Sequence, residues 1–451
     1  MTAIAELPGP RGLPGLGNAH QIRPDRLHVM IEQWGRRYGP VFRFSMGSRP
    51  VVGFTAPDAI NAMLRERPDG YRRWREVESV ANEMGIVGPF TSEGADWRRQ
   101  RRLAVTALNT NHLRSYFDVI RVATERLHTR LEAKQGQEIE ILEDFMAYSV
   151  DITSALAFGE DLNTLEHGDG ELERHIGRVF EMLSRRILAP VPYWRYVKPP
   201  ADRAAEHSLE VLREAIAGFI ADARARMEAR PELLEAPENF LESMLTRPEY
   251  SDADVAGNVF TMLLAGEDTT ANTLAWATYI LGQDPASQRR LATEADATLG
   301  PDRTPQRAEA ADAMRFGEAV FRESARLKST VPVIFLEPNT DTTVAGVELP
   351  AGTRVVALTR QAARPERVAR FDPDRWLDGA ENPVFLTFGA GPRFCPGRNL
   401  AFLEGKTALA MLGRNFDIEP VGRPPREHFG FTMSPAGLRV RLHPRKVPAS
   451  N

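Results

Sequence analysis

The chain has 451 residues, with 57 basic and 61 acidic side chains and a formal net charge of −4. This balance excludes the basic excess typical of nucleic-acid-binding proteins, and a single cysteine excludes an internal disulfide. The first residues form no apolar run of signal-peptide or membrane-spanning length, so we expect a cytoplasmic protein without a membrane anchor.

The first elements mix strands with helices. Residues 24–39 predict an amphipathic helix, with Pro24 near its start and Gly39 after its end. Residues 41–55 alternate in polarity around a turn at Gly47 and Ser48, which predicts a β-hairpin. From about residue 58 to residue 329 the apolar residues recur at three- and four-residue steps, as in helices.

One helix in this region, at residues 93–103, carries Trp97 and Arg101 on one face, four positions apart. The arginines around them are typical of a solvated basic face. A longer helix begins at a capping box formed by Ser251 and Asp254 and reaches a stop at Gly282. Its apolar face is interrupted by residues 267–270, polar side chains that in most helices are solvated or bonded to the preceding turn.

A third helix carries Glu323 and Arg326 three positions apart, which by itself indicates a surface salt bridge. Residues 331–357 then change to β-branched residues separated by Gly and Pro turns and predict short strands. After the cysteine loop, residues 398–416 predict another helix, and residues 430–445 a final hairpin. The chain is therefore expected to be mainly α with a smaller β region.

The cysteine loop, FGAGPRFCPG, places Cys395 just before this last helix. A helix N-terminus favours thiolate over thiol, so we expect a lowered pKa for Cys395. The glycines allow positive φ and close approach, and Arg393 is able to bind a carboxylate or phosphate. Three interpretations remain: a buried structural cysteine, a catalytic nucleophile without an identifiable His partner, or the single protein ligand of a haem iron.

The loop resembles the haem-binding loop of the cytochrome P-450 family, the haem-thiolate monooxygenases. The match rests on Phe388, Gly389, Gly391, Arg393, Cys395 and Gly397. The long helix is similar to the central helix of that family at Ala265, Gly266, Asp268 and Thr269. Two further elements of the family, Glu-x-x-Arg with Phe-x-Pro-x-Arg and Trp-x-x-x-Arg, are matched by Glu323, Arg326 and Arg375, and by Trp97 and Arg101.

The resemblance implies one role for each motif. Cys395 would be the axial ligand of haem b, and Trp97, Arg101 and Arg393 would hold the haem propionates. Ala265 and Gly266 would let the central helix pass close to the cofactor, while Asp268 and Thr269 relay protons. Glu323, Arg326 and Arg375 would form a structural network that holds the segment before the loop.

The resemblance also implies the architecture: a soluble, bacterial-type member of the family, a triangular prism of helices forming one domain over residues 1–451. A β-rich lobe would comprise about residues 1–67 and 331–363 with the C-terminal hairpin, and a helical lobe about residues 68–330 and 397–416. The haem would lie between the central helix and the cysteine loop, with no fused reductase. We expect a monomer.

The implied activity is insertion of one oxygen atom from O2 into an apolar small molecule. Electrons would come from a ferredoxin or flavodoxin with its NAD(P)H reductase, docked on a basic face that includes Arg99, Arg102, Arg398 and Lys406. The alternatives are a haem-thiolate peroxygenase or isomerase, a haem carrier or sensor, and a helical interaction protein. Residues 68–92 and 176–200, with Leu264 and Ala265, are the expected pocket walls.

One position departs from the family pattern. Members commonly carry a basic residue near the haem on the strand after the Glu-x-x-Arg helix, and this chain has Glu337 in roughly that place. Either a neighbouring residue replaces the missing cation, or the haem is held by fewer cations.

Overall fold

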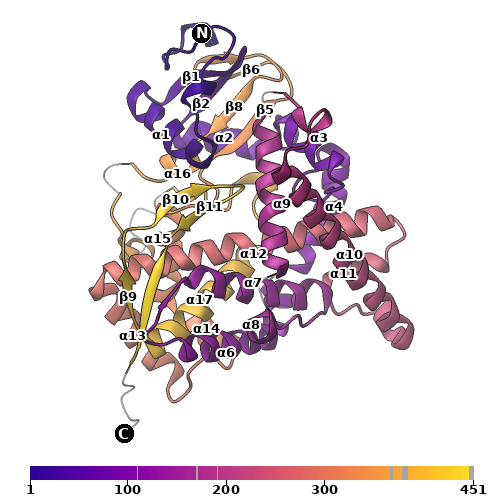
Figure 1. The fold of residues 1–451 in the computed structure, drawn as a ribbon, viewed down its shortest axis with the longest axis vertical. Helices are drawn as coiled ribbons and strands as arrows, with labels where there is room; N and C mark the ends of the chain where they lie inside the picture. Colours follow the sequence, from indigo (N-terminus) through magenta and orange to yellow (C-terminus); the bar gives the residue numbers. More distant parts are fainter. Residues whose placement is uncertain (109, 169–170, 190, 366–368, 378–383, 446–451) are drawn as a thin grey trace.

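The computed structural model describes residues 1–108, 110–168, 171–189, 191–365, 369–377 and 384–445. A helical part occupies most of the molecule, and a smaller sheet part carries the N-terminus at one end (Figure 1). None of the helices in the described ranges is long and apolar enough to cross a membrane.

The helices confirm the mainly α prediction. Their bounds are α1 Leu27–Tyr38, α2 Pro57–Arg65, α3 Arg75–Glu83, α4 Gly94–Ala107, α5 Thr110–Ser115, α6 Phe117–Ala133, α7 Ile141–Phe158, α8 Thr164–His167, α9 Glu171–Leu188, α10 Pro200–Ala229, α11 Phe240–Leu245, α12 Asp252–Gln283, α13 Pro285–Leu299, α14 Ala308–Ala313, α15 Arg315–Leu327, α16 Thr359–Ala362 and α17 Arg398–Asn415.

The strands form small sheets. Their bounds are β1 Val41–Met46, β2 Arg49–Phe54, β3 Tyr71–Arg73, β4 Glu138–Ile139, β5 Ile334–Pro338, β6 Thr342–Val344, β7 Val347–Leu349, β8 Arg354–Ala357, β9 Phe416–Val421, β10 Arg426–Phe429, β11 Met433–Ala436 and β12 Arg439–Pro444. The largest sheet has the order β1-β2-β8-β5-β3 and contains the predicted β1–β2 hairpin.

The prediction of a single hairpin at residues 430–445 is wrong. Strand β11 pairs with β10, whereas β12 pairs with β9 and β4 in another sheet. Each strand takes a partner that lies outside the predicted segment. The β10–β11 hairpin that results has its tip at residues 430–432.

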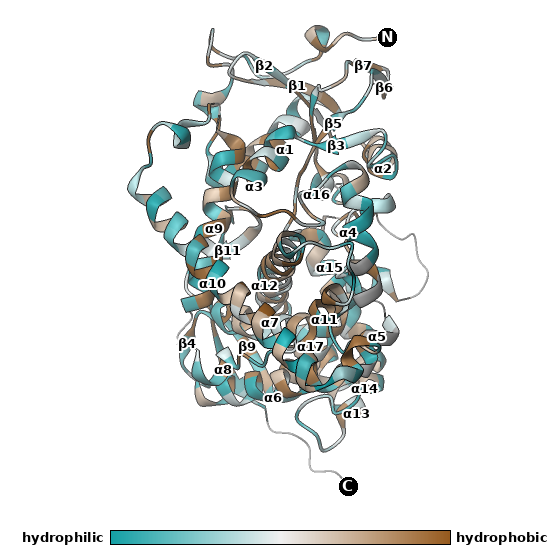
Figure 2. Cartoon of the chain, turned by 90° about the vertical axis from the view of Figure 1, so that its right-hand side faces the viewer, coloured by the Kyte–Doolittle hydropathy of each residue, from teal (hydrophilic) through white to brown (hydrophobic). Residues whose placement is uncertain are grey.

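Helix α12 crosses the centre of the molecule, and Figure 2 looks nearly along it, with other helices around it. Its N-terminus has the predicted capping box, because the Ser251 hydroxyl accepts from the Asp254 N–H and the Asp254 carboxylate accepts from the Ser251 N–H. The helix continues for 32 residues to Gln283. Most of its side chains are buried, so any exposed residue in its middle has to be explained.

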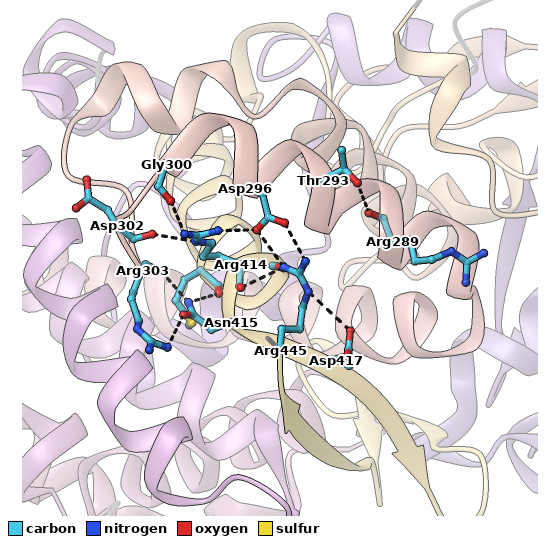
Figure 3. Close-up of polar contacts among 12 residues, drawn as sticks. Arg289, Thr293, Asp296, Gly300, Asp302, Arg303, Arg414, Asn415, Asp417 and Arg445 are labelled. Carbon is cyan, nitrogen blue, oxygen red and sulfur yellow. Dashed lines mark hydrogen bonds and ion pairs between the residues drawn. The ribbon is translucent and has the colours of Figure 1, made fainter. Parts of the chain in front are cut away.

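The end of α17 remote from the cysteine is tied to α13 and to Arg445, the residue after the last strand. Asp296 of α13 accepts from Arg414 at 2.8 Å and from Arg445 at 2.9 Å, as Figure 3 shows. Arg445 also donates to the carbonyl oxygens of Gly413 and Arg414, which have no partner within the helix. This contact fixes the position of the helix that begins at the cysteine loop.

Candidate functional site

The cysteine loop makes a tight turn into α17. The backbone N–H of Cys395 donates to the carbonyl of Phe388 at 2.8 Å, which closes the loop. Gly389 and Gly391 have φ of 72° and 68°, a region that favours glycine. A Cβ on Gly391 would lie 2.5 Å from the Cα of Arg65, so this glycine also allows contact with α2. Gly397 has a φ of −77° and is the N-cap of α17.

The expected lowering of the Cys395 pKa is wrong for the protein alone. Burial raises the pKa of this thiol, and that effect outweighs the N–H groups of Gly397 and Arg398 and the charge of Arg101, which lower it. The donors that the sequence predicted are therefore present, but desolvation is larger. A cation bound directly to the sulfur would reverse the balance, because a coordinated thiol is deprotonated.

Two aromatic residues precede the cysteine in the loop. Phe388 packs against the ring of Phe402 with centroids 5.3 Å apart, which joins the loop to the body of α17. Phe394 is 41% exposed and lies under the guanidinium of Arg101, 4.8 Å from the ring centroid. Arg101 also donates to the carbonyl oxygen of Phe394. In this structure the Arg101 of α4 therefore contacts the cysteine loop.

Arg393 is buried beside α4 and is not fully paired. Its Nη2 donates to the carbonyl of Ser92 at 2.7 Å and to the carboxylate of Glu93 at 2.5 Å, and the guanidinium stacks on Trp97. Its Nε and Nη1 are buried without a hydrogen-bond partner. Burial and the charge of Arg73 lower the pKa of Arg393 to about 9.

Two further arginines lie around Arg393, and sequence reasoning missed both. Arg67 is 3% exposed, and its Nε and Nη2 have no partner. Burial and the charges of Arg73 and Arg393 lower the pKa of Arg67. Arg73 donates from Nε to the Phe90 carbonyl at 2.8 Å. We call Arg67, Arg73 and Arg393, with the carboxylate of Glu93, the arginine cluster.

The arginine cluster carries more positive than negative charge in a buried place. Burying an unpaired charge costs several kcal/mol, so buried arginines are normally paired. Arg73 belongs to β3, which pairs with β5, where the family pattern has its basic residue and this chain has Glu337. Glu337 is itself buried and accepts from the Arg75 N–H at 3.3 Å. The cluster thus brings cations to the region where the strand lacks one.

The middle of α12 contributes Ala265 and Gly266. Ala265 is exposed although the residues before it, Leu263 and Leu264, are buried, so α12 presents an open surface there. A Cβ on Gly266 would lie 2.2 Å from Oγ1 of Thr153 on α7. This contact gives Gly266 a role in helix packing, which the prediction of a cofactor-contacting residue did not include.

Asp268 and Thr269 are neighbours in the chain but do not hydrogen-bond to each other. The Thr269 hydroxyl donates to the Ala265 carbonyl at 3.0 Å. The Asp268 carboxylate accepts from Asn272 and from the Thr432 hydroxyl at the hairpin tip. Burial raises the pKa of Asp268, and those two hydrogen bonds oppose the shift. The acid is therefore directed toward the hairpin in this structure.

Glu323, Arg326 and Arg375 come together in what we call the Glu323 network. Arg326 donates to both carboxylate oxygens of Glu323, at 2.8 and 2.7 Å, and both side chains are fully buried. Arg375 adds a bond at 3.0 Å, Trp376 one at 2.9 Å, and the N–H of Asp372 one at 3.1 Å. The network fixes the segment that leads toward the cysteine loop.

Two of the four cations expected on a docking face are already paired. Lys406 is 6% exposed and binds Asp312 at 2.8 Å. Arg99 makes two bonds to the Asp254 carboxylate, at 2.9 and 3.2 Å. The prediction is wrong for Lys406, which is buried, and Arg99 is partly exposed but already neutralises a carboxylate of this chain.

Comparison with known proteins gives a match over nearly the whole chain. The sequence model of the family described as Cytochrome P450 matches residues 7–442. Cyclooctatin synthase of Streptomyces melanosporofaciens is 28% identical over 97% of this chain and 95% of its own. Cytochrome P450 3A12 of Canis lupus familiaris is 27% identical over 92% and 86%. The protein LUTEIN DEFICIENT 5, chloroplastic, of Arabidopsis thaliana is 26% identical over 96% and 76%. These relatives are bacterial, animal and plant proteins, so they do not establish a bacterial type.

Proposed function

The chain belongs to the cytochrome P450 family, and from that premise we propose that it is a haem-thiolate monooxygenase that oxidises an apolar organic substrate. The observation that carries the proposal is the cysteine loop at the start of α17, close to a buried arginine cluster whose charge is not balanced. A thiolate ligand and an excess of buried cations suit a group that combines a metal with carboxylates.

The donor set fits haem b, iron protoporphyrin IX. Cys395 would hold the iron through Sγ, as the single thiolate that the protein supplies. Arg67, Arg73 and Arg393 would hold the propionates, and the orphaned Nε and Nη atoms of Arg67 and Arg393 are donors suited to carboxylates. The exposed Ala265 and the buried Leu264 would face the cofactor and substrate. Trp97 would position Arg393 by stacking on its guanidinium, and Arg101 would position the cysteine loop through its bond to the Phe394 carbonyl.

When bound, haem supplies the redox chemistry and dioxygen activation that no side chain of this chain provides. The protein contributes the thiolate of Cys395, whose electron donation favours O–O cleavage. Residues of the arginine cluster bind and orient the cofactor. The backbone N–H groups of Gly397 and Arg398 act to lower the pKa of the Cys395 thiol and so favour its negative charge.

Proton delivery falls to Asp268 and Thr269. Because burial raises the pKa of Asp268, its carboxyl can hold a proton closer to neutral pH than an exposed aspartate. The Thr269 hydroxyl can give up its bond to the Ala265 carbonyl and pass a proton from the acid toward the reaction site. This transfer requires the Asp268 side chain to turn from Thr432.

Aromatic rings pack together in the region that is expected to bind substrate. Phe90 and Phe180 lie in the two stretches expected to form the pocket walls, although residue 190 of the second stretch is outside the described residues. Both rings pack on Phe431. These apolar surfaces support an apolar substrate. Electrons would come from a ferredoxin or flavodoxin with its NAD(P)H reductase.

Thr269→Ala tests the proposed proton relay. With haem, substrate and redox partners present, the variant should bind substrate normally but release most reducing equivalents as hydrogen peroxide, with roughly a tenfold or greater loss of product per NAD(P)H. Thr278→Ala is the matched control, because its hydroxyl also donates to a carbonyl four residues earlier, at 2.8 Å. Product yield should be unchanged in the control.

The same assay distinguishes the proposed monooxygenase from the alternative, a haem-thiolate peroxygenase. A haem-thiolate peroxygenase would form product with peroxide alone and show no requirement for NAD(P)H and O2. A wild-type protein that behaves in this way contradicts the proposed reaction, and a Thr269→Ala variant that keeps full product per NAD(P)H contradicts the proton relay.

A further inference from the structure

The tip of the β10–β11 hairpin connects the substrate region with the acid of α12. Thr432 is 6% exposed and its hydroxyl donates to Oδ2 of Asp268, while Asn272 donates to Oδ1 and holds the other oxygen. Both oxygens of the carboxylate are therefore occupied by uncharged donors. One donor comes from the same helix and the other from a residue 164 positions away.

The residue before Thr432 lies between two elements that form the expected pocket walls. The ring of Phe431 stacks on Phe180 of α9, with centroids 4.8 Å apart and planes at 18°. It also meets the edge of Phe90, at 5.4 Å and 67°. Ser184 of α9 donates to the Gly430 carbonyl at 2.9 Å. The hairpin tip is therefore in direct contact with α9 and with the segment around Phe90.

The other end of the hairpin is held by ion pairs. Glu427 of β10 accepts from Lys328 at 2.7 Å, from Arg360 at 3.0 Å and from His28 at 3.0 Å. Glu427 receives three hydrogen bonds, two of them from charged side chains, whereas Thr432 and Phe431 at the tip make one hydroxyl bond to a carboxylate and ring contacts. A displacement of the hairpin is therefore easier at the tip than at Glu427.

We propose that Thr432 is a positioning residue, which holds Asp268 directed toward the hairpin until a substrate displaces the ring of Phe431. Displacement moves Thr432, breaks its bond to Oδ2 and leaves Asp268 free to turn toward Thr269. Proton delivery is then coupled to occupancy of the pocket. This inference rests on the proposed monooxygenase function and assigns a regulatory contact within the same site.

The test compares Thr432→Val, which keeps the shape but removes the hydroxyl, with Thr432→Ser, which restores it. The readout is the rate of NAD(P)H consumption without substrate relative to the rate with substrate. In the valine variant this ratio should rise roughly three- to tenfold, the range for loss of one hydrogen bond. The serine variant should return it to the wild-type value.

Two controls identify the contact. Ser434→Ala removes a hydroxyl from the same strand, β11, and should leave the ratio unchanged. In an Asp268→Asn background, Thr432→Val should have less effect than in the wild type, because coupled residues are not additive. An unchanged ratio in Thr432→Val, or an equal change in Thr432→Ser, overturns the proposal.

A second measurement does not depend on turnover. Hydrogen–deuterium exchange of the backbone amides at residues 430–433 should be faster in Thr432→Val than in the wild type and in Ser434→Ala. Unchanged exchange contradicts the positioning role even where monooxygenase activity is present. If reductant-dependent oxidation is absent, the proposed function fails, whereas the exchange result still decides whether Thr432 restrains the hairpin tip.

Discussion

The Glu323 network and the arginine cluster are two groups of charged side chains in the interior that differ in how fully their hydrogen-bonding atoms are paired. In the network, Glu323 receives three side-chain donors and a backbone N–H, and the Arg326 Nη1 reaches the Ala363 carbonyl at 2.7 Å. In the cluster, buried nitrogens of Arg67 and Arg393 have no partner. Both groups satisfy their carboxylate, because Glu93 accepts from the Arg73 N–H and from Arg393, but only the cluster leaves guanidinium nitrogens without a partner.

The difference separates a structural role from a binding role. A buried ion pair that is complete fixes the fold, and removing one partner leaves the other desolvated. A buried cluster with free donors is stable only at a cost, which an incoming anion would offset. We therefore expect substitutions in the network to affect folding first, and substitutions in the cluster to affect cofactor retention first.

The largest effect is expected for Glu323→Gln. The substitution leaves the fully buried Arg326 without its carboxylate and should destabilise the protein by about 3–5 kcal/mol. Urea unfolding followed by circular dichroism measures the change. Glu318→Gln is a control on the same helix: its bond to Arg322 is partly exposed and should contribute less than about 1 kcal/mol, and Lys406, 3.5 Å away, keeps its bond to Asp312. Equal losses of stability in Glu323→Gln and Glu318→Gln would contradict a special structural role for the Glu323 network.

A smaller effect, in a different property, is expected for Arg67→Met. The substitution removes a buried charge whose Nε and Nη2 make no hydrogen bond, so the stability of the haem-free protein should be unchanged or higher. Transfer of haem to an apo-globin should become roughly tenfold faster or more, in line with the loss of a charged hydrogen bond. If Arg67→Met loses stability but retains its haem, Arg67 has a structural role and does not bind the cofactor.

The smallest effect concerns pH. Burial disfavours the charged form of Glu427, but the bond from His28 and the charges of Arg360 and Lys328 outweigh it and lower its pKa. A lowered carboxyl pKa gives stability that is present above the unfolded value of about 4.3 and lost as pH falls below it. Glu427→Gln should therefore flatten the acid side of the stability curve, by about 1.4 kcal/mol per pKa unit.

Glu404 of α17 provides the opposite case. Burial raises its pKa, and the bond from Thr270 only partly opposes the shift. A raised carboxyl pKa gives a contribution that is fully present below the unfolded value and lost as pH rises toward the folded value. Glu404→Gln should flatten the stability curve at higher pH and leave the acid side unchanged. Similar curves for the two variants would contradict the assignment of the shifts.

Local patterns in the sequence were sufficient for part of this picture. The capping box of Ser251 and Asp254 and the pairing of Glu323 with Arg326 depend on residues three positions apart, so spacing predicts them. Arg375 was found through its motif. The mainly α fold followed from helical periodicity over long segments.

Contacts between distant segments were not predictable in the same way. Arg67 and Arg73 have no motif, and their place beside Arg393 is what distinguishes them from surface arginines. The bond from Thr432 to Asp268 joins residues far apart in the chain. Strand pairing likewise depends on tertiary structure. Local patterns do not reveal it, and residues 430–445 were therefore wrongly assigned to one hairpin. The direction of the pKa shift of Cys395 depends on how deeply the thiol is buried, which the spacing of residues in the sequence does not reveal.

The most direct test of the account is the ligand of the haem iron. Wild-type protein and Cys395→Ser are reconstituted with haem, reduced and exposed to carbon monoxide, and the Soret absorbance is recorded. We expect a long-wavelength Soret band, diagnostic of a thiolate ligand, in the wild type and its loss in the serine variant. A variant that keeps this band, or a wild-type protein that lacks it, contradicts the assignment of Cys395.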